Sequence, residues 1–260
     1  MSATLTVTVV GCSGSFPGPH SAASCYLIES TVGDETTRVV LDLGSGSLGQ
    51  LQRYVDPFDL DAILVTHLHA DHFMDLTGLY VLRKYHPERA ASERLPVYAP
   101  KGMFKRLQLA YYGSADMKRG EQFDHRRVTD GDVIEIGSLR ITPRQVDHPI
   151  EAYGYRFESP AGTVGFTGDT DTCPALTPLL ENADIVLADG AFVTGRDEIR
   201  GIHLTPRRAA KAAIAAGGVK RLVLTHIPPW NDAEACRAEA AALWPQVEVT
   251  HAGARYSLSS

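Results

Sequence analysis

The sequence predicts an α/β fold in which two β-sheets pack face to face and helices cover their outer faces. Three observations favour this class. The first half of the chain is rich in strand patterns, and after residue 160 strands alternate with helices. Residues 95–167 contain almost no helical pattern, which argues against a doubly wound parallel sheet. The chain has no repeat or long linker, so we expect residues 1–260 to form a single domain.

Strands are expected where short runs alternate between polar and apolar residues or are continuously apolar. A turn at Gly33 and Asp34 should join two of the early strands. The expected strands are residues 4–10, 25–29, 38–43, 61–66, 95–99, 133–136, 139–143, 153–158, 163–167, 184–188, 221–225, 247–250 and 255–258.

Helices are expected where apolar residues recur at every third or fourth position. The expected helices are residues 72–85, 176–182, 206–216 and 233–243. The third of these has the clearest ends. Thr205 suits the N-cap, Pro206 suits the first helical position, and Gly217 with Gly218 suits the stop.

Composition and charge exclude several classes of protein. With 44% hydrophobic and 22% charged residues, the chain is typical of a globular protein and not of a disordered or fibrous one. A net charge of −6 disfavours broad nucleic-acid binding, which needs a basic face. No apolar run of 18 residues and no leader pattern predicts membrane insertion or secretion. The four scattered cysteines, Cys12, Cys25, Cys173 and Cys236, predict reduced thiols in the cytoplasm.

The strongest local signal is the sequence T-H-L-H-A-D-H over residues 66–72, where an expected strand meets an expected helix. His67 and His69 can point the same way from an extended segment. Asp71 and His72 can turn toward the same space from the bend into the helix. Imidazole and carboxylate groups are the ligands that suit Zn²⁺ and similar divalent ions. The segment therefore predicts a metal site at this junction.

Three further candidate ligands stand beside later strands. His148 and Asp169 each follow an expected strand, and His226 ends another. Together with the first four they make seven candidate ligands, which is enough for two metal ions. Asp169 suits a position between the two ions, because a carboxylate can bridge two metals and an imidazole cannot.

One more histidine, His203, stands just before the expected helix over residues 206–216. A free imidazole held near a metal site is a natural general acid, although this pattern also fits a histidine in a surface loop. No role in the site is expected for the remaining histidines, which are His20, His86, His125 and His251.

Two glycine-rich loops need separate interpretation. Residues 44–49 match G-x-G-x-x-G, a pattern of dinucleotide-binding folds. Here the pattern follows the third strand of a hairpin-rich region, so we do not expect a nicotinamide or flavin. We expect a tight turn that lets the backbone approach the metal site. Residues 11–15 can line the same pocket, and for both loops substrate contact and simple turn formation stay open alternatives.

Taken together, these motifs resemble those of the metallo-β-lactamase superfamily from about Leu5 to the C-terminus. The resemblance implies an αββα sandwich of two mixed β-sheets flanked by helices, with a two-metal site along one edge. Zn²⁺ is the expected metal, with Mn²⁺ and Fe²⁺ as alternatives. We assign His67, His69 and His148 to one ion, Asp71, His72 and His226 to the other, and Asp169 to the bridging position.

Several details are similar to the ribonuclease Z and phosphodiesterase branch of that superfamily. The most specific is the H-x-T element at His203, because in that branch its histidine assists phosphodiester cleavage. The others are the loop over 11–15, D-L-G over 42–44, T-G-D-T over 167–170 and L-T-H over 224–226. The resemblance implies that His203 protonates the leaving oxygen or binds the charge that develops on phosphorus, while Asp71 orients the nucleophile.

Two departures separate the chain from other branches. The commonest dizinc β-lactamases carry cysteine at the position of Asp169 and lack the H-x-T element. Ribonuclease Z enzymes usually have an arm that grips tRNA between the metal-binding histidine and the bridging aspartate. Only 21 positions separate His148 from Asp169 in this chain, and an expected hairpin fills them.

The whole pattern, including H-I-P-P-W over residues 226–230, resembles small members of the superfamily that are associated with cyclic-nucleotide hydrolysis. It predicts a cytoplasmic dimetal phosphodiesterase that hydrolyses 3′,5′-cyclic AMP to AMP. The alternatives are a ribonuclease Z-like RNA 3′-processing nuclease, a thioester or lactone hydrolase, and a metal-binding regulatory protein. The expected partner is a small cyclic nucleotide, with neither a stable nucleic acid nor a membrane. The base preference and the formation of a homodimer stay open.

Overall fold

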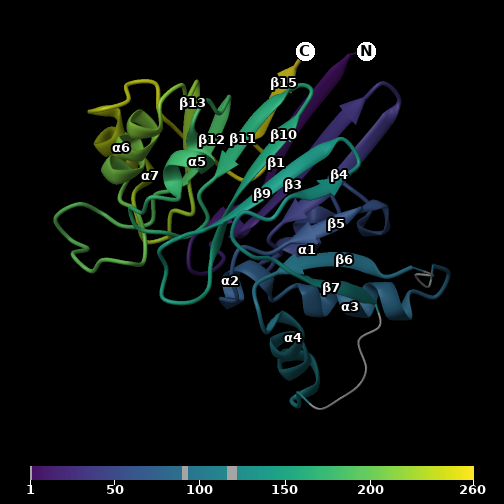
Figure 1. Ribbon diagram of the computed structural model, residues 1–260. Coiled ribbons are helices and arrows are strands. Elements are labelled where there is room, and N and C mark those ends of the chain that lie inside the picture. The colour runs from purple at the N-terminus through teal and green to yellow at the C-terminus, as the bar shows by residue number, and fades with distance from the viewer. Residues whose placement is uncertain (1, 90–92, 116–121) are drawn as a thin grey trace.

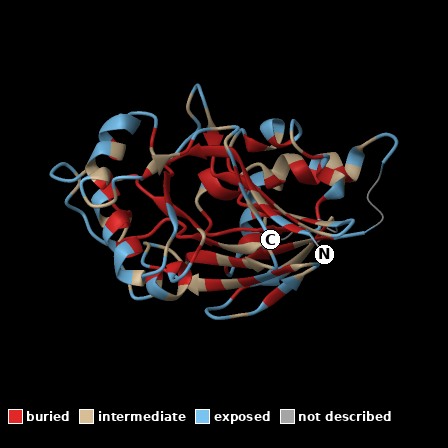
Figure 2. Cartoon of the chain, turned by 90° about the horizontal axis from the view of Figure 1, so that it is seen from above, coloured by how far each residue is buried: buried red, intermediate tan, exposed pale blue. Residues whose placement is uncertain are grey.

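The computed structural model describes residues 2–89, 93–115 and 122–260, and it has four layers (Figure 1). Two β-sheets pack face to face, and helices cover the outer face of each. Tyr26 from one sheet and Tyr155 and Phe157 from the other lie fully buried in the core between them. Figure 2 shows the buried residues running through the middle layers and the exposed residues on the outer helices and loops. The expected fold of two mixed sheets flanked by helices is confirmed.

The first sheet is built mainly from the first half of the chain. In spatial order its strands are β15 (Arg255–Ser259), β1 (Ala3–Ser13), β3 (Cys25–Val32), β4 (Glu35–Leu41), β5 (Ala62–Leu64), β6 (Leu95–Ala99) and β7 (Phe123–Arg127), with β2 (Ala22–Ala23) beside β1. The strands from β15 to β4 pair antiparallel, and those from β4 to β7 pair parallel. A two-residue turn joins β3 to β4, and Gly33 has the positive φ, 60°, that its first position requires.

The second sheet is built from residues 134–249. In spatial order its strands are β14 (Glu248–Val249), β13 (Arg221–Thr225), β12 (Ile185–Asp189), β11 (Gly162–Phe166), β10 (Tyr153–Ser159), β9 (Leu139–Gln145) and β8 (Ile134–Ile136). The strands from β8 to β11 form antiparallel hairpins, and those from β11 to β14 are parallel. The carboxyl ends of the parallel strands in both sheets therefore carry the loops on which a site can be built.

The helices divide between the two outer faces. The first sheet is covered by α1 (Ser47–Leu51), α2 (Ala70–Phe73), α3 (Leu76–Tyr85) and α4 (Met103–Tyr112), and the second by α5 (Leu176–Leu180), α6 (Pro206–Ala216) and α7 (Ala233–Ala241). A short 3₁₀ turn (Pro57–Asp59) precedes β5. Helix α6 has the expected ends, because the Thr205 hydroxyl accepts a hydrogen bond from the Arg208 amide and Gly217 is the C-cap. No described helix has the length and apolar character needed to span a membrane.

The single helix expected over residues 72–85 is wrong, because the structure divides it into α2 and α3. The Asp75 amide donates to the Leu43 carbonyl oxygen in the loop after β4, at 3.0 Å, instead of to a carbonyl within the helix. The Asp75 carboxylate in turn accepts from the Leu48 amide at 2.9 Å. These contacts with a distant loop interrupt the helix, and a local pattern cannot reveal them.

The expectation of almost no helix between residues 95 and 167 is also wrong. Helix α4 connects β6 to β7, which are parallel and so need a crossover connection. Its buried side chains are few, Met103, Leu107 and Gln108, and Phe104 and Leu109 are exposed, so its apolar pattern is weak. Residues 116–121 of this interval lie outside the described part. The fold is still not a doubly wound single sheet, because the second sheet supplies the other half of the core.

Candidate metal centre

The seven predicted ligands converge at one edge of the sandwich, at the ends of strands from both sheets. The segment after β5 supplies His67, His69, Asp71 and His72, and the other three lie on loops of the second sheet. His148 follows β9, Asp169 follows β11 and His226 follows β13. The two sheets meet there through an isolated bridge between His67 and Ala152.

One group consists of three imidazoles. His69 Nδ1 lies 2.9 Å from His67 Nε2 and 3.2 Å from His148 Nε2. The three nitrogen atoms face one another, with no carboxylate among them. The His148 ring is oriented by its other nitrogen, Nδ1, which lies 2.9 Å from the Ile202 carbonyl oxygen. Three imidazole nitrogens at one point form a donor set that suits a divalent transition metal.

The second group combines two imidazoles with two carboxylates, and all four residues are buried. Asp71 Oδ2 lies 3.3 Å from both His72 Nε2 and His226 Nε2. Asp169 Oδ2 lies 3.2 Å from His72 Nε2 and 3.4 Å from His226 Nε2, and 3.6 Å from His67 Nε2 in the first group. One oxygen of Asp169 thus stands between the two groups.

An unpartnered nitrogen provides a test of whether a cation fits this second group. His72 Nε2 is buried and has no hydrogen-bond partner among the described residues, although two carboxylates stand beside it. A buried polar atom in this position is costly unless something else satisfies it. The donor set, two imidazole nitrogens with two carboxylate oxygens, suits a divalent metal ion in that place.

Behind His72 lies a buried carboxylate, Asp42, for which no role was expected from the sequence. Asp42 Oδ2 is 2.7 Å from His72 Nδ1, and Asp42 accepts hydrogen bonds from the amide and hydroxyl of Thr66 and from the hydroxyl of Ser24. Asp42 has a positive φ of 60°, directly after β4. Its hydrogen bond fixes which His72 nitrogen points into the site, as outer carboxylates commonly do for metal-binding histidines. Its sequence signals were its place at a strand end and the D-L-G motif over residues 42–44.

A second buried carboxylate, Asp189 at the end of β12, supports the predicted general acid. His203 Nδ1 lies 2.9 Å from Asp189 Oδ2 and 4.0 Å from Asp169 Oδ2. Asp189 also accepts hydrogen bonds from the amides of Thr170 and Leu204. The structure therefore places His203 beside the candidate ligands, with one ring nitrogen held and the other, Nε2, not engaged by Asp189.

The electrostatics of the cluster favour positive charge between the carboxylates. Burial alone would raise the pKa of Asp169, but the charges of His226, His72 and His67 outweigh it and hold that pKa well below its usual range. Burial alone would lower the pKa of His226, but Asp169, Asp189 and Asp71 raise it to about 10. The negative charge of the carboxylates favours the protonated form of the histidine rings, and the same negative charge would attract a metal cation.

The all-imidazole group behaves in the opposite way. Burial lowers the pKa of His67 well below its usual value, and the neighbouring His72 lowers it further. Burial also lowers the pKa of His69 and of His148. Neutral imidazoles are the form that binds metals, so this group is ready to act as ligand without losing a proton.

A third carboxylate missed by the sequence analysis, Asp171, fastens the loop that carries His203. Asp171 is buried and accepts hydrogen bonds from the Gly201 amide at 2.9 Å and from the guanidinium groups of Arg200 and Arg208, each at 2.5 Å. Because Asp171 lies two positions after Asp169, this cluster ties the loop after β11 to the loop before α6.

The glycine-rich loops pack against the backbone of the candidate ligands. A Cβ atom at Gly44 would overlap the Asp71 carbonyl oxygen, and one at Gly14 would overlap that of His226. The expected close approach of both loops to the site is confirmed. The loop over residues 44–49 also opens α1 in a parallel unit between β4 and β5, which the sequence analysis did not expect.

The four histidines for which no role was expected lie outside the clusters of candidate ligands found among the described residues. His125 is packed between the rings of Phe104 and Phe123 on the far side of the first sheet. His251 is exposed.

Comparison with known proteins supports the geometry. The profile of the beta-lactamase superfamily domain matches residues 37–227. The protein ML1173 of Mycobacterium leprae is 41% identical over 242 residues, covering 92% of this chain and 83% of that protein. Ribonuclease Z of Methanopyrus kandleri is 25% identical over 284 residues, covering 96% of both chains. The crystal structure of YhfI from Bacillus subtilis, described as a metallo-beta-lactamase fold protein, superposes with a TM-score of 0.84 at 26% identity, covering 98% of this chain and 99% of YhfI.

Proposed function

The chain belongs to the beta-lactamase superfamily, a group of metal-dependent hydrolases, and on that premise we propose that it is a dimetal phosphodiesterase. Its proposed substrate is a small cyclic nucleotide, 3′,5′-cyclic AMP, which it hydrolyses to AMP. One observation carries the proposal: Asp169 Oδ2 stands between two groups of candidate ligands, and a histidine held by its own carboxylate stands 4.0 Å from that oxygen.

In this proposal the seven residues hold two divalent ions. The ligands are His67, His69 and His148 for one ion, Asp71, His72 and His226 for the other, and Asp169 between them. A pair of ions there would polarise the phosphoryl oxygens and provide a water nucleophile at neutral pH. Zn²⁺ suits the histidine-rich donors best. Asp71, the more exposed of the two carboxylates, also orients the nucleophile.

His203 supplies the proton that the leaving ribose oxygen needs when the phosphodiester bond breaks. Burial would lower its pKa, but the charge and hydrogen bond of Asp189 outweigh burial and raise it. The protonated ring is therefore favoured, with Nδ1 held by Asp189 and Nε2 available to donate. A phosphodiester has a poor alkoxide leaving group, so a positioned acid matters more there than for a thioester.

The rival proposal is an RNA 3′-processing nuclease, and the similarity to a ribonuclease Z favours it. Against it, the interval from His148 to Asp169 holds the hairpin of β10 and β11, which leaves little chain for an RNA-gripping arm. The net charge of −6 also offers little attraction to a polyanion. We therefore rank a small substrate above RNA. The four free cysteines support the cytoplasm as the proposed compartment.

The test compares three substrates on one metal-loaded preparation: cyclic AMP, a precursor tRNA and a simple thioester. We expect about two metal ions per chain, and hydrolysis of cyclic AMP that exceeds cleavage of the other two. That activity should depend little on salt, because the substrate carries one charge. Salt-sensitive cleavage of precursor tRNA without hydrolysis of cyclic AMP would replace the proposal with the nuclease, and thioester cleavage alone would replace it with a thioesterase.

A further inference from the structure

Two aromatic side chains form an exposed pair beside the candidate metal centre. The ring centroids of Phe16 and Trp230 lie 5.0 Å apart, with the planes tilted by 38°. Phe16 is 41% exposed and Trp230 is 62% exposed, although both belong to loops that pack on the centre. Contiguous exposed apolar surface is costly in water and commonly marks a place where a ligand binds.

Both rings lie near His226 because the backbone beside each of them is held close to it. Phe16 is near through a packing contact, and Trp230 is near along the chain. Gly14 packs directly on the His226 backbone, and Phe16 lies only two residues further along, a span of at most about 7 Å. The Ser13 hydroxyl donates to the Phe16 carbonyl oxygen at 2.7 Å, which fixes the turn. On the other side, the stiff pair of prolines at 228 and 229 separates His226 from Trp230.

The loop of Trp230 is also linked to the proposed general acid. The side-chain amide of Asn231 donates to the Ala191 carbonyl oxygen at 2.8 Å. The next residue, Phe192, packs on the ring of His203 with centroids 5.0 Å apart. The aromatic pair is thus placed by the same loops that hold His226 and His203.

The charges around the pair suit an uncharged ring better than a phosphate. The nearby guanidinium of Arg196 donates to the Asn231 side chain, and the Asp197 carboxylate pairs with it at 2.6 Å. The positive charge is therefore neutralised within the loop. A phosphate would find its compensating charge at the metal centre, which leaves the aromatic pair for an apolar, planar group.

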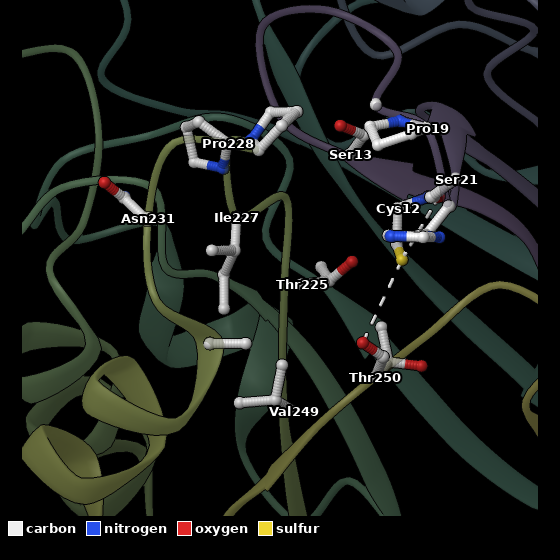
Figure 3. A pocket seen from close by; sticks show the side chains of 14 residues that line it. Cys12, Ser13, Pro19, Ser21, Thr225, Ile227, Pro228, Asn231, Val249 and Thr250 are labelled. Carbon is white, nitrogen blue, oxygen red and sulfur yellow. Dashed lines mark hydrogen bonds between the residues drawn. The ribbon is translucent and has the colours of Figure 1, made fainter.

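A cavity between the same loops is a less suitable place for such a group. Figure 3 shows Ser13 and Pro19 on one loop facing Ile227, Pro228 and Asn231 on the other. Its volume is about 210 Å³, below the roughly 300 Å³ at which pockets for small molecules begin. Its lining, taken from the described residues, also includes none of the seven candidate ligands.

We propose that Phe16 and Trp230 form a nucleobase-binding site, on which the base of the substrate stacks while its phosphodiester lies at the metal centre. The assignment rests on the proposed function, and it makes Trp230 a determinant of specificity for nucleotides over other phosphodiesters. Stacking suits any base, because each offers a π face to an aromatic ring.

The binding test uses the tryptophan itself as the reporter. The chain has two tryptophans, so Trp244→Phe leaves Trp230 as the single one. Titration of this metal-loaded variant with AMP should quench the Trp230 fluorescence saturably, because the base stacks on the indole ring. Ribose 5-phosphate has the same phosphate without a base, and it should not. Quenching by both compounds, or by neither, would overturn the proposal.

The kinetic test asks whether the rings bind the base. Trp230→Ala should raise KM for cyclic AMP by about 5- to 150-fold, the range that stacking of a base on an aromatic ring gives. Trp230→Phe keeps a ring and should recover most of the affinity. The inhibition constant of ribose 5-phosphate, which has no planar ring, serves as the internal reference and should not change. Tyr85→Ala removes an equally exposed ring on α3, 59% exposed, and should change nothing.

The two proposals fail in different ways. Suppose that cyclic AMP is not hydrolysed, but AMP quenches the Trp230 fluorescence and ribose 5-phosphate does not. The base site then stands, and the proposed reaction is refuted. If cyclic AMP is hydrolysed while Trp230→Ala leaves KM unchanged, the phosphodiesterase stands and the base site is refuted. An equal rise in KM for cyclic AMP and in the inhibition constant of ribose 5-phosphate would also refute it, because that would indicate a general distortion of the centre.

Discussion

The two halves of the molecule contribute to the candidate centre in different ways. The first half supplies four candidate ligands from six consecutive residues, and one buried carboxylate, Asp42, supports them from the neighbouring strand end. The second half supplies one candidate ligand from each of three separate loops. Its supporting carboxylate, Asp189, receives hydrogen bonds from two of the loops around it, through the Thr170 amide after β11 and through His203 and Leu204 before α6.

This contrast shows that the two half-sites have different structural requirements. The first needs a strand end, a turn and one supporting carboxylate, all set within a short piece of chain. The second depends on the register of β9, β11 and β13 and on hydrogen bonds that tie their loops together. Disruption of the second sheet should therefore scatter its ligands, whereas the first segment can keep its shape.

The largest effect is expected at Asp169, the point at which the two halves meet. Asp169→Ala should reduce metal content from about two ions per chain and remove nearly all activity, because one oxygen serves both groups. Metal analysis and hydrolysis should be measured on the same sample. Asp130→Ala, which removes an exposed carboxylate in the turn between β7 and β8, is the control and should behave like the parent protein. A fully active, metal-free Asp169→Ala protein would contradict the two-metal assignment.

The next effect is expected at His203, which belongs to the second half but is not among the assigned ligands. His203→Ala should retain both ions and lose about 10²–10⁴-fold in kcat, with KM little changed, because a positioned general acid contributes on that scale. The loss should shrink for a nitrophenolate leaving group, which needs no proton. His251→Ala removes an exposed histidine and serves as the control. Wild-type kcat on cyclic AMP would remove the proton-donor role.

The same contrast explains how much of the site could be predicted from the sequence. The first four ligands form a compact motif, and the remaining three were found because strand ends carry polar residues in an otherwise apolar pattern. The supporting role of three buried carboxylates was not predicted, namely those of Asp42, Asp171 and Asp189. In a sequence, a buried aspartate cannot be distinguished from an aspartate in a turn until its hydrogen-bond partners are known. Those partners are up to 37 positions away, as for Arg208 and Asp171.

The fold was predictable where it depends on local sequence patterns and not where it depends on contacts between distant segments. Strands that are short apolar runs, such as β6 and β13, have the expected bounds. The break between α2 and α3 was not predictable, because it depends on a hydrogen bond from Asp75 to Leu43 in another segment. Helix α4 was missed because only three of its side chains are buried while apolar Phe104 and Leu109 are exposed, which leaves little periodic signal.

A smaller effect is expected at Asp42, which tests the support of the first half alone. Asp42→Ala should weaken metal binding by about 10- to 100-fold, the range found for outer partners of metal-binding histidines. The expected loss is confined to the ion assigned to His72, whose ring Asp42 orients at 2.7 Å. Metal titration should therefore show one weakened and one nearly normal site. Asp61→Ala removes a carboxylate that accepts from the Arg38 amide elsewhere in this half, and it should leave both sites normal. Equal weakening of both ions would contradict the separation of the two groups.

The smallest effect on catalysis is expected at Asp171, which tests the loop ties of the second half. Asp171→Asn weakens the hydrogen bonds that hold Arg200, Arg208 and the Gly201 amide, so we expect a loss of about 1–3 kcal/mol of unfolding free energy. The loop carrying His203 should then exchange its amide hydrogens faster, while those of the first-half segment stay protected. Metal content should not change. Glu234→Gln, which removes the charge of an exposed carboxylate paired with Arg237 in the same half, controls for lost surface charge.

The pH dependence of stability gives the sign of the Asp171 contribution. Burial would raise the pKa of Asp171, but hydrogen bonds from Arg200, Gly201, Thr172 and Arg208 lower it below its usual value of 3.8. A carboxylate with a lowered pKa stabilises the fold at every pH above 3.8, and this contribution is lost as the pH falls from there through the folded-state value. Denaturant titrations should therefore separate parent and Asp171→Asn most clearly near pH 7 and bring them progressively closer as the pH falls from 3.8 towards the folded-state value. A difference that stays constant in acid would mean that the ties of this loop do not depend on the Asp171 charge.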